Sequence, residues 1–271
     1  MPSGSMGSME APQIPAQNRV TPLGEVVAAA GRCAWMGNRG RLHEGSGSRV
    51  VLRHHQSRAW ITCVLSFHGR DAEQWDPHHY TPLFFLDEAV AFAAGHRPCA
   101  ECRRAAYREF AAATARLLRV TRLGAPELDR HLHEERWDPP RRTRRLHRVP
   151  WSELPNGSFV RLEVGPALVQ ADHVTLWRPD NTYGDRLERP RLGLATVITP
   201  PSTLAVLRSG YAVHIGDHAT PSLAVTDPVS PTRSSPGLRA DAVAPWPGTT
   251  PSKESNAAET LSSGEEYGAR W

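Results

Sequence analysis

Apolar residues recur along the chain with two different periods, which predicts a mixed α+β fold. Val50–Arg53 and Ala59–Phe67 are rich in β-branched and aromatic side chains and are expected to be strands. Leu83-Phe84-Phe85 is expected to be a short strand or the end of one. A short helix should follow, because Asp87 can cap its N-terminus and Gly95 can end it in the left-handed conformation.

Two longer helices are predicted next, at residues 101–119 and 126–137. In the first, apolar residues recur at steps of four, three and four, the spacing of one helix face. The members of this face are Ala106, Phe110, Ala113 and Leu117. Arg103, Arg104 and Arg108 lie off the face, so we expect them to point to solvent or to a ligand.

Short β-like segments punctuated by Gly and Pro dominate the second half of the chain. They lie at residues 159–163, 167–170, 173–177, 194–198 and 211–215. A helix is expected at residues 200–208, before the last of them. This pattern is typical of a small sheet or a partly open barrel.

Composition divides the chain into five parts. Residues 1–20 are small and polar, and residues 219–271 are rich in Pro, Ser, Thr and Ala without periodicity, so both ends are expected to be disordered. Between them we expect a zinc-stapled α+β domain at residues 21–137 and a β-rich domain at residues 151–218. An Arg-rich linker at residues 138–150 should join the two.

Nothing in the sequence indicates a membrane-spanning or secreted protein. The mean hydropathy is −0.45, and no apolar run reaches the roughly 18 residues of a membrane helix. The N-terminal segment lacks the basic and apolar regions of a secretory signal. We therefore expect a cytoplasmic protein whose cysteines stay reduced.

The region from residue 19 to residue 218 is basic. It contains 28 Arg and no Lys against 21 Asp and Glu. A GC-rich genome would produce this preference for Arg, and so would bidentate contacts to phosphate. The positive charge favours an anionic partner. Residues 141–148 alone contain five Arg, which fits either a grip on a nucleic-acid backbone or a solvated linker.

Cys99 and Cys102 form a C-x-x-C pair, the most informative motif in the sequence. In a reducing compartment such a pair more often binds a metal than forms a disulfide. The predicted helix begins at Cys102, so its N-terminal N–H groups would stabilise thiolate charge. A thioredoxin-like role would need a βαβ unit, which the pattern does not predict. The pair therefore predicts a structural zinc site.

A tetrahedral structural site needs two further ligands. Cys63 is the best third ligand, because it lies in an expected strand upstream of the pair. The alternative for Cys63 is a buried free thiol. Cys33 is the simplest fourth ligand. Its rivals are His43, His68 and His79.

The residues around the pair resemble a known family. Phe85-Leu86-Asp87-Glu88-Ala89 and Ala94-Gly95-His96-Arg97-Pro98-Cys99-Ala100-Glu101-Cys102-Arg103-Arg104 resemble the zinc-binding module of the Ada DNA-repair methyltransferase. That module has a Phe-containing strand, a short helix with Glu-Ala, and a Gly-aromatic-Arg-Pro-Cys-x-x-Cys segment. The resemblance covers Cys63 to Arg104 and implies a Cys-rich zinc site in a domain that contacts DNA phosphates.

The sequence departs from that module in one place. The Ada module begins with two closely spaced cysteines, and one zinc-bound thiolate of Ada accepts a methyl group from a methylated phosphate. Here Cys63 stands alone, with Cys33 far upstream. The departure bears on the methyl-acceptor chemistry more than on the metal site. The wider chain also resembles a group of uncharacterised bacterial proteins in Gly37–His43, in the Cys99 motif and in Ile198–Thr203.

Histidines supply further candidates. The loop Gly37–His43 either binds a phosphate through its N–H groups or forms a simple turn. His43 is a candidate metal ligand, general base or surface residue. His131 and His133 would point to different faces of a helix and could not share an ion there. No magnesium-type Asp/Glu cluster is evident, so only a one-metal histidine nuclease stays open.

These features together predict a zinc-binding protein that binds nucleic acid, with DNA as the expected partner. The arginines expected to contact phosphate are Arg39, Arg97, Arg103, Arg104 and Arg108. One alternative is an enzyme, either a nuclease with His43 or His133 as general base or a methyl acceptor using the Cys63 thiolate. Another is a non-catalytic zinc-stapled module that binds a protein. No nucleotide-binding motif is present, so no organic cofactor is expected.

Overall fold

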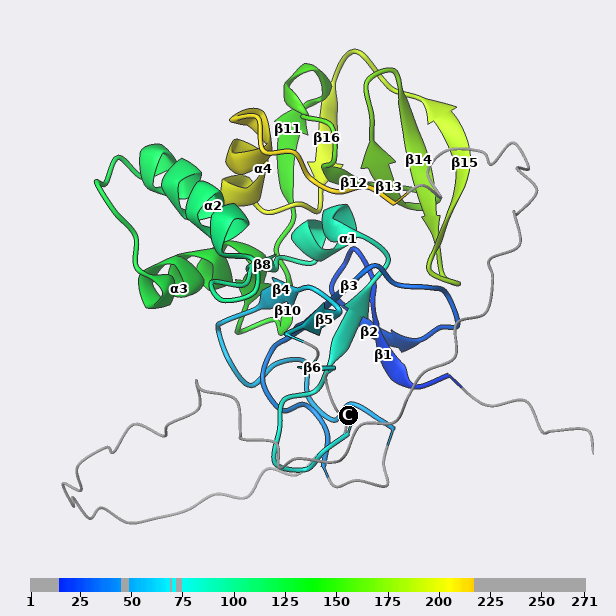
Figure 1. Ribbon diagram of the computed structural model, residues 1–271. Coiled ribbons are helices and arrows are strands. Elements are labelled where there is room, and N and C mark those ends of the chain that lie inside the picture. The colour runs from blue at the N-terminus through cyan, green and yellow to red at the C-terminus, as the bar shows by residue number, and fades with distance from the viewer. Residues whose placement is uncertain (1–14, 45–48, 69, 72–74, 217–271) are drawn as a thin grey trace, which may run out of the picture. The chain divides into compact units, whose positions relative to one another are not determined.

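Two six-stranded sheets and four α-helices make up most of the described chain, which confirms the α+β class (Figure 1). The computed structural model describes residues 15–44, 49–68, 70, 71 and 75–216. The tail expected at residues 219–271 lies outside the described residues, as do residues 1–14. Gln17–Val20 form strand β1, so the disorder predicted for residues 1–20 does not extend to them.

The first sheet has the strand order β2-β1-β7-β3-β4-β8. Its strands are β1 Gln17–Val20, β2 Val26–Ala28, β3 Trp35–Asn38, β4 Ile61–Cys63, β7 Leu83–Phe85 and β8 Arg97–Pro98. β4 and β8 run parallel, with Ile61 opposite Arg97 and Thr62 opposite Pro98. Pro98 lacks an N–H group and fits here because β8 is the edge strand. Val50–Arg53, predicted to be a strand, is irregular.

The second sheet is antiparallel, in the order β11-β16-β12-β13-β14-β15. Its strands are β11 His147–Pro150, β12 Phe159–Leu162, β13 Gly165–Val169, β14 His173–Arg178, β15 Thr182–Glu188 and β16 Leu194–Val197. It does not close into a barrel. The strand predicted near residues 211–215 is absent, and β15 was missed because most of its residues are polar and exposed.

Outside the two large sheets, the described residues also form two small hairpins and one 3₁₀ helix. They are β5 Ser66–Phe67 with β6 Arg70–Asp71, β9 Trp137–Asp138 with β10 Thr143–Arg144, and η1 Trp151–Glu153. β10 and β11 lie within residues 138–150, so the expected linker contributes strands to the fold.

The four helices are α1 Glu88–Ala93, α2 Arg104–Leu117, α3 Ala125–Arg136 and α4 Pro201–Arg208. As predicted, the Asp87 carboxylate caps α1, accepting the Val90 N–H at 2.8 Å, and Gly95 follows the helix with φ of +87°. α2 begins at Arg104 rather than at Cys102. None of the helices in the described residues has the length and apolar character needed to cross a membrane.

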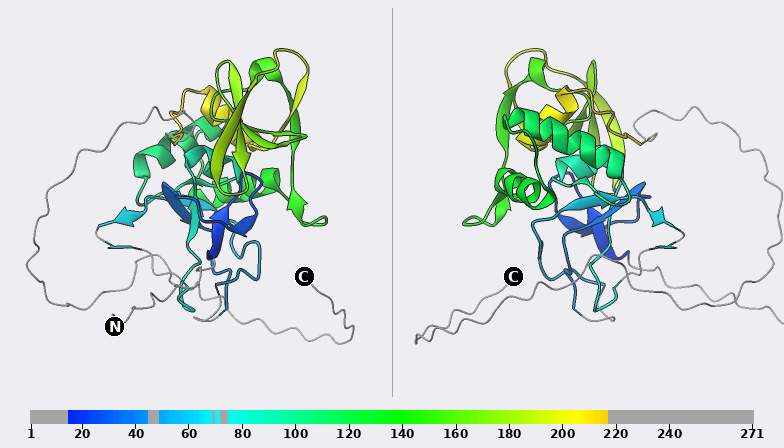
Figure 2. Two further views of the ribbon diagram at one scale, coloured as in Figure 1. Left: turned by 90° about the vertical axis from the view of Figure 1, so that its right-hand side faces the viewer. Right: turned by 60° about the vertical axis from the view of Figure 1, so that its left-hand side comes forward.

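The two sheets share a hydrophobic core. α1 lies between them (Figures 1 and 2) and buries Ala89 and Val90 in one cluster with Phe85 of the first sheet and Phe159 and Leu168 of the second. A second cluster, containing Phe92, Phe110, Leu128, Leu132 and Val206, packs α2, α3 and α4 together. The segments expected as separate domains at residues 21–137 and 151–218 therefore belong to one compact unit.

Two buried carboxylates at the start of α1 join distant parts of the chain. Asp87 accepts hydrogen bonds from the Tyr183 hydroxyl at 2.8 Å and the Gly216 N–H at 3.0 Å. Glu88 accepts from the Tyr211 hydroxyl at 2.7 Å and the His214 N–H at 2.9 Å. The C-terminal end of the described chain is therefore held against α1 by hydrogen bonds to two buried carboxyl groups.

Replacing Asp87 with Ala should lower the free energy of unfolding by about 2–4 kcal/mol, because it removes the cap of α1 and leaves two buried donors without an acceptor. Tyr183→Phe removes only one of these bonds and should cost about 1 kcal/mol. Urea denaturation followed by circular dichroism measures both changes. Asp185→Ala, which removes an exposed ion pair, is the control. Equal losses in Asp87→Ala and Asp185→Ala would contradict this role of Asp87.

Candidate metal centre

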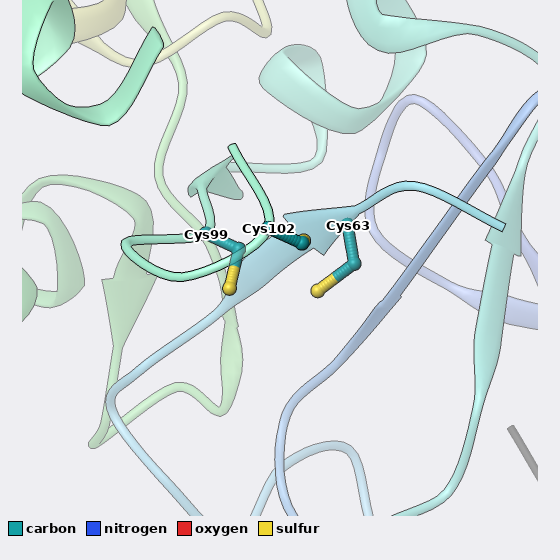
Figure 3. A group of neighbouring side chains, drawn as sticks. All are labelled: Cys63, Cys99 and Cys102. Carbon is teal, nitrogen blue, oxygen red and sulfur yellow. The ribbon is translucent and has the colours of Figure 1, made fainter. Parts of the chain in front are cut away.

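Three cysteines converge beside the first sheet. The Sγ atoms of Cys63, Cys99 and Cys102 all lie within 4.8 Å of one another. Figure 3 shows the three side chains gathered at the end of β4 and in the turn that follows β8. Zinc binds thiolates at about 2.3 Å, so two thiolates on one ion lie within roughly 4.6 Å of each other. This group could therefore hold a metal ion.

The pairing of β4 with β8 creates this arrangement. The Cys99 N–H donates to the Thr62 carbonyl at 2.9 Å, which continues the ladder past Pro98 and brings Cys99 beside Cys63. The chain then turns, and the Arg103 N–H donates to the Cys99 carbonyl at 3.2 Å. This turn carries Cys102 back to the same place, before α2 begins.

Backbone groups prepare the site for thiolate charge. The Glu101 N–H donates to the Cys99 sulfur at 3.4 Å. The pKa of the Cys99 thiol is lowered, first by hydrogen bonds from the Cys102 and Cys63 thiols and then by the Glu101 and Cys102 N–H groups. The same thiol contacts raise the pKa of Cys63. A metal ion would displace the remaining thiol protons, because only thiolates are ligands.

The site is largely shielded from solvent. Cys63 and Cys99 are each 8% exposed and pack in a small cluster with Met36, while Cys102 is more exposed. This burial suits a structural ion. It disfavours Cys63 as a methyl acceptor, because a substrate would reach Cys102 more easily.

The predicted fourth ligands lie elsewhere. Cys33 is not part of the group; its sulfur accepts from the Asn181 side chain at 3.4 Å, beside the β14–β15 turn. His43 is buried, with Nδ1 2.6 Å from the Thr81 hydroxyl and Nε2 3.0 Å from the Asp76 carbonyl. Both ring nitrogens of His43 are thus occupied, so neither Cys33 nor His43 joins the three cysteines.

His68 and His79 do not join them either. His68 is exposed, and His79 contacts the Asp76 carboxylate through Nδ1 at 2.5 Å. Tyr80 is a neighbour that the sequence did not indicate. Burial and the nearby charges of the three cysteines raise the pKa of Tyr80 to about 12.

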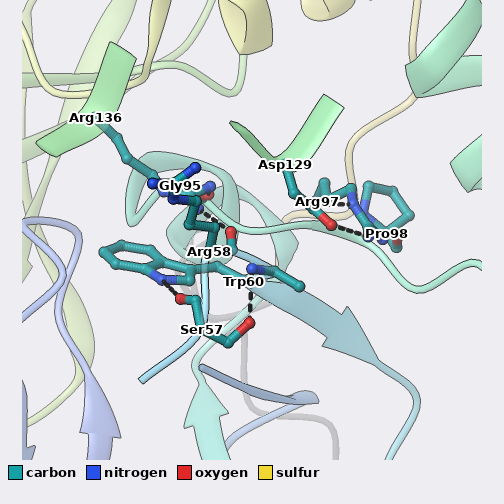
Figure 4. A network of polar contacts seen from close by, with 9 residues as sticks. Ser57, Arg58, Trp60, Gly95, Arg97, Pro98, Asp129 and Arg136 are labelled. Atoms are coloured by element: carbon teal, nitrogen blue, oxygen red, sulfur yellow. Dashed lines mark hydrogen bonds and ion pairs between the residues drawn. The ribbon is translucent and has the colours of Figure 1, made fainter. Parts of the chain in front are cut away.

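Three of the five arginines expected to contact phosphate are inside the protein, which corrects that prediction. The Arg97 guanidinium forms a bidentate ion pair with Asp129, with both N···O distances 2.7 Å (Figure 4). Arg103 pairs with Glu88 and lies 4.0 Å over the Trp35 ring, with a side chain only 7% exposed. Arg39 is fully buried. Only Arg104 and Arg108 are exposed.

The structure also shows where the predicted phosphate-binding loop and the two histidines of α3 lie. Gly37 and Asn38 belong to β3 rather than to a loop, and a Cβ at Gly37 would lie 2.1 Å from the Ile61 carbonyl oxygen. His131 and His133 point apart, as predicted for a helix: His131 contacts the Ser202 hydroxyl at 2.9 Å, whereas His133 lies against the His55 ring. The Nδ1 atom of His133 is buried without a partner in the described structure.

No protein-family model, curated protein or solved structure matches the chain. The chemistry of the site therefore has to follow from its own residues.

Purified protein should contain about one zinc ion per chain, as a structural site requires. Cys63→Ser, Cys99→Ser and Cys102→Ser should each bring the metal content close to zero, because each removes a thiolate from the ion. Cys33→Ser is the matched control and should keep the metal, since Cys33 lies outside the group. Elemental analysis measures the ratio. Metal loss in Cys33→Ser, or metal retention in Cys99→Ser, would contradict the assignment.

Proposed function

We propose that the chain is a zinc-binding protein of the Ada-like type that binds nucleic acid, with DNA as the expected partner. The observation that carries the proposal is the convergence of Cys63, Cys99 and Cys102 at the turn that starts α2. Thiolates are soft ligands that favour zinc over magnesium or calcium. The ion would fix the first turn of α2 relative to the first sheet.

The order of elements around the cysteines supports the Ada-like type. Phe85 ends β7, α1 follows directly after Asp87, and Gly95 leads into β8 and the C-x-x-C pair. This is the succession of strand, short helix and cysteine pair that the resemblance implies. The second of the two closely spaced cysteines of that module has no counterpart in the group seen here.

The exposed face of α2 supports nucleic-acid binding. Arg104 and Arg108 are one helical turn apart and lie on the same face of α2. Within the described structure neither forms an ion pair, so both guanidinium groups can contact phosphate. Arg103, at the start of the same helix, is turned inward by Glu88 and Trp35. The inward contacts hold the helix start while its outer face stays available.

The Arg104→Ala, Arg108→Ala double variant should weaken binding to a labelled DNA duplex about tenfold or more at low salt. The logarithm of the binding constant falls linearly with the logarithm of the salt concentration, and this slope should become shallower by about 2. Each phosphate contact contributes about 0.9 to the slope, and the variant removes two such contacts. Fluorescence anisotropy over a salt series measures both quantities. Arg161→Ala with Arg191→Ala, exposed positions in the second half of the chain, is the charge-matched control. An unchanged slope in the α2 variant would contradict the proposal.

The salt series also separates the proposal from a protein-binding module. Binding that hardly changes with salt would favour a protein partner, because phosphate contacts release counterions and protein contacts do so much less.

A nuclease is the second candidate, and of the two predicted bases His133 is the one that keeps an unpaired ring nitrogen in the described structure. His43 has both ring nitrogens occupied, whereas Nδ1 of His133 is unpaired. Burial and the Arg136 charge lower the pKa of His133 to about 4, so the ring is neutral at pH 7. His133→Ala should abolish any DNA cleavage while leaving the zinc content unchanged. Cleavage that persists in this variant would exclude His133 as the base.

A further inference from the structure

Three arginines from distant parts of the chain gather away from the cysteines. Arg39 follows β3, Arg136 ends α3 and Arg144 ends β10. The guanidinium groups of Arg39 and Arg136 lie over the Trp60 ring, at 4.0 and 4.1 Å from its centroid. We call Arg39, Arg136 and Arg144 the arginine cluster.

The partners of the arginine cluster are carbonyl oxygens instead of carboxylates. Arg39 Nη1 donates to Gly24 at 2.8 Å, and Arg136 Nη1 donates to Gly95 at 2.6 Å. Arg144 Nη2 donates to the Ala93 carbonyl at 2.5 Å. Figure 4 shows Arg136 directed at the backbone of Gly95 and Arg58, beside Trp60. Within the described residues none of the three forms an ion pair with a carboxylate.

This arrangement is electrostatically costly. Burial, followed by the charges of Arg144 and Arg136, lowers the pKa of Arg39. Burial and the charge of Arg144 likewise lower the pKa of Arg136, and the charges of Asp129 and Glu135 oppose this only in part. Buried charges are normally paired, because desolvation of an unpaired ion costs several kcal/mol. A negatively charged ligand beside the arginine cluster would therefore be stabilised by it.

Buried N–H groups around the arginine cluster also lack acceptors. Arg39 Nη2, Arg136 Nε and Arg144 Nε are enclosed and have no hydrogen-bond partner in the described structure. His96 adds a fourth donor. Its Nε2 atom accepts from Arg39 Nε at 3.2 Å, so the proton of the neutral ring lies on Nδ1, which is buried and unpaired. A ligand with several acceptor oxygens would satisfy these donors.

Two glycines let the backbone approach the arginine cluster closely. Gly24 and Gly95 have φ of +86° and +87°. A Cβ at Gly24 would lie 3.5 Å from Arg39 Nη2 and 3.6 Å from Arg144 Cδ, and one at Gly95 would lie 2.9 Å from Arg144 Nη1. Arg144 thus lies within reach of both glycines and links Arg39 to Arg136.

Histidine rings lie between the arginine cluster and solvent. His54, His55 and His133 are half-buried; His54 Nε2 is 3.2 Å from Arg39 Nη1, and the rings of His55 and His133 are 4.9 Å apart. Burial and the Arg39 charge lower the pKa of His54 to about 2 and that of His55 to about 4. These rings are neutral at pH 7, so the rim offers hydrogen bonds without adding or cancelling charge.

We propose that the arginine cluster and its histidine rim form a binding site for a phosphate group. A phosphate supplies the negative charge and the several acceptor oxygens that the donors lack, and guanidinium groups match its geometry. The phosphate is either free or the terminal phosphate of a nucleic-acid strand. This site shares no residue with the cysteine group and does not depend on the binding of nucleic acid by α2.

The test compares the full-length protein in phosphate and in chloride at equal ionic strength. Phosphate should raise the melting temperature of the wild type, and isothermal titration should give a saturable affinity. Arg144→Gln should weaken that affinity at least about tenfold, because it removes a charged donor. An oligonucleotide with a 5′-phosphate, compared with the same strand without it, shows whether a strand end is the source.

His55→Glu keeps the test decisive if Arg144→Gln does not fold. The new carboxylate would stand at the half-exposed rim and pair with the arginine cluster, so this variant should melt at or above the wild-type temperature and lose the response to phosphate. His78→Glu, at an exposed position, is the matched control and should keep the response. The Arg104→Ala, Arg108→Ala variant should also keep it.

Three results would overturn the proposal. One is a wild type that responds to neither phosphate nor the phosphorylated strand beyond the response to chloride. The other is a response to phosphate that is equal in the wild type and in His55→Glu, since the site would then lie elsewhere. Loss of the response in the α2 double variant would likewise place the phosphate on α2 and exclude the arginine cluster.

Discussion

The short parallel pairing of β4 with β8 is the constraint on which both candidate sites depend. At one end of this ladder the Arg97 N–H donates to the Trp60 carbonyl at 3.0 Å, and at the other the Cys99 N–H donates to Thr62 at 2.9 Å. The cysteines meet just beyond the second bond. Trp60 takes part in the first bond, and the guanidinium groups of Arg39 and Arg136 pack on its ring. Metal site and arginine cluster therefore lie at the two ends of one ladder.

Buried charge is handled in two different ways in this fold. Arg97 with Asp129 and Arg103 with Glu88 are conventional pairs in which opposite charges neutralise each other. Arg39 and Arg136 instead rely on carbonyl dipoles and on the face of Trp60. Dipoles and an aromatic face attract a cation but do not neutralise it. This contrast separates the arginines that pair with a carboxylate from the two that, within the described residues, do not.

The sequence predicted the elements whose signals are local. The C-x-x-C pair, the Asp87 cap and the Gly95 turn depend on a few adjacent residues, and the cap and turn were confirmed, with Cys99 and Cys102 in the group that could hold a metal. Burial of Arg97 and Arg103 was not predictable, because their acidic partners are distant in sequence.

Other features escaped prediction for equally physical reasons. Cys33 has the chemistry of a ligand, but spacing alone does not reveal that its segment turns toward Asn181. β15 is mostly exposed and polar, so it lacks the apolar alternation that identifies a strand. The arginine cluster combines residues from three separate segments. Arg39 and Arg144 belong to segments that the sequence linked to phosphate, but no local motif shows that Arg136 joins them.

The partners of Asp87 and Glu88 have a consequence for synthesis of the chain. Both carboxylates are buried at the start of α1, yet Gly216 and His214, which donate to them, are at the far end of the described chain. A ribosome therefore exposes α1 and the first sheet long before their polar groups can be satisfied. Until residue 216 leaves the exit tunnel, the N-terminal half is an incomplete core in which both acids still lack their donors from the end of the described chain. The protein must complete its folding after, and not during, translation of these residues.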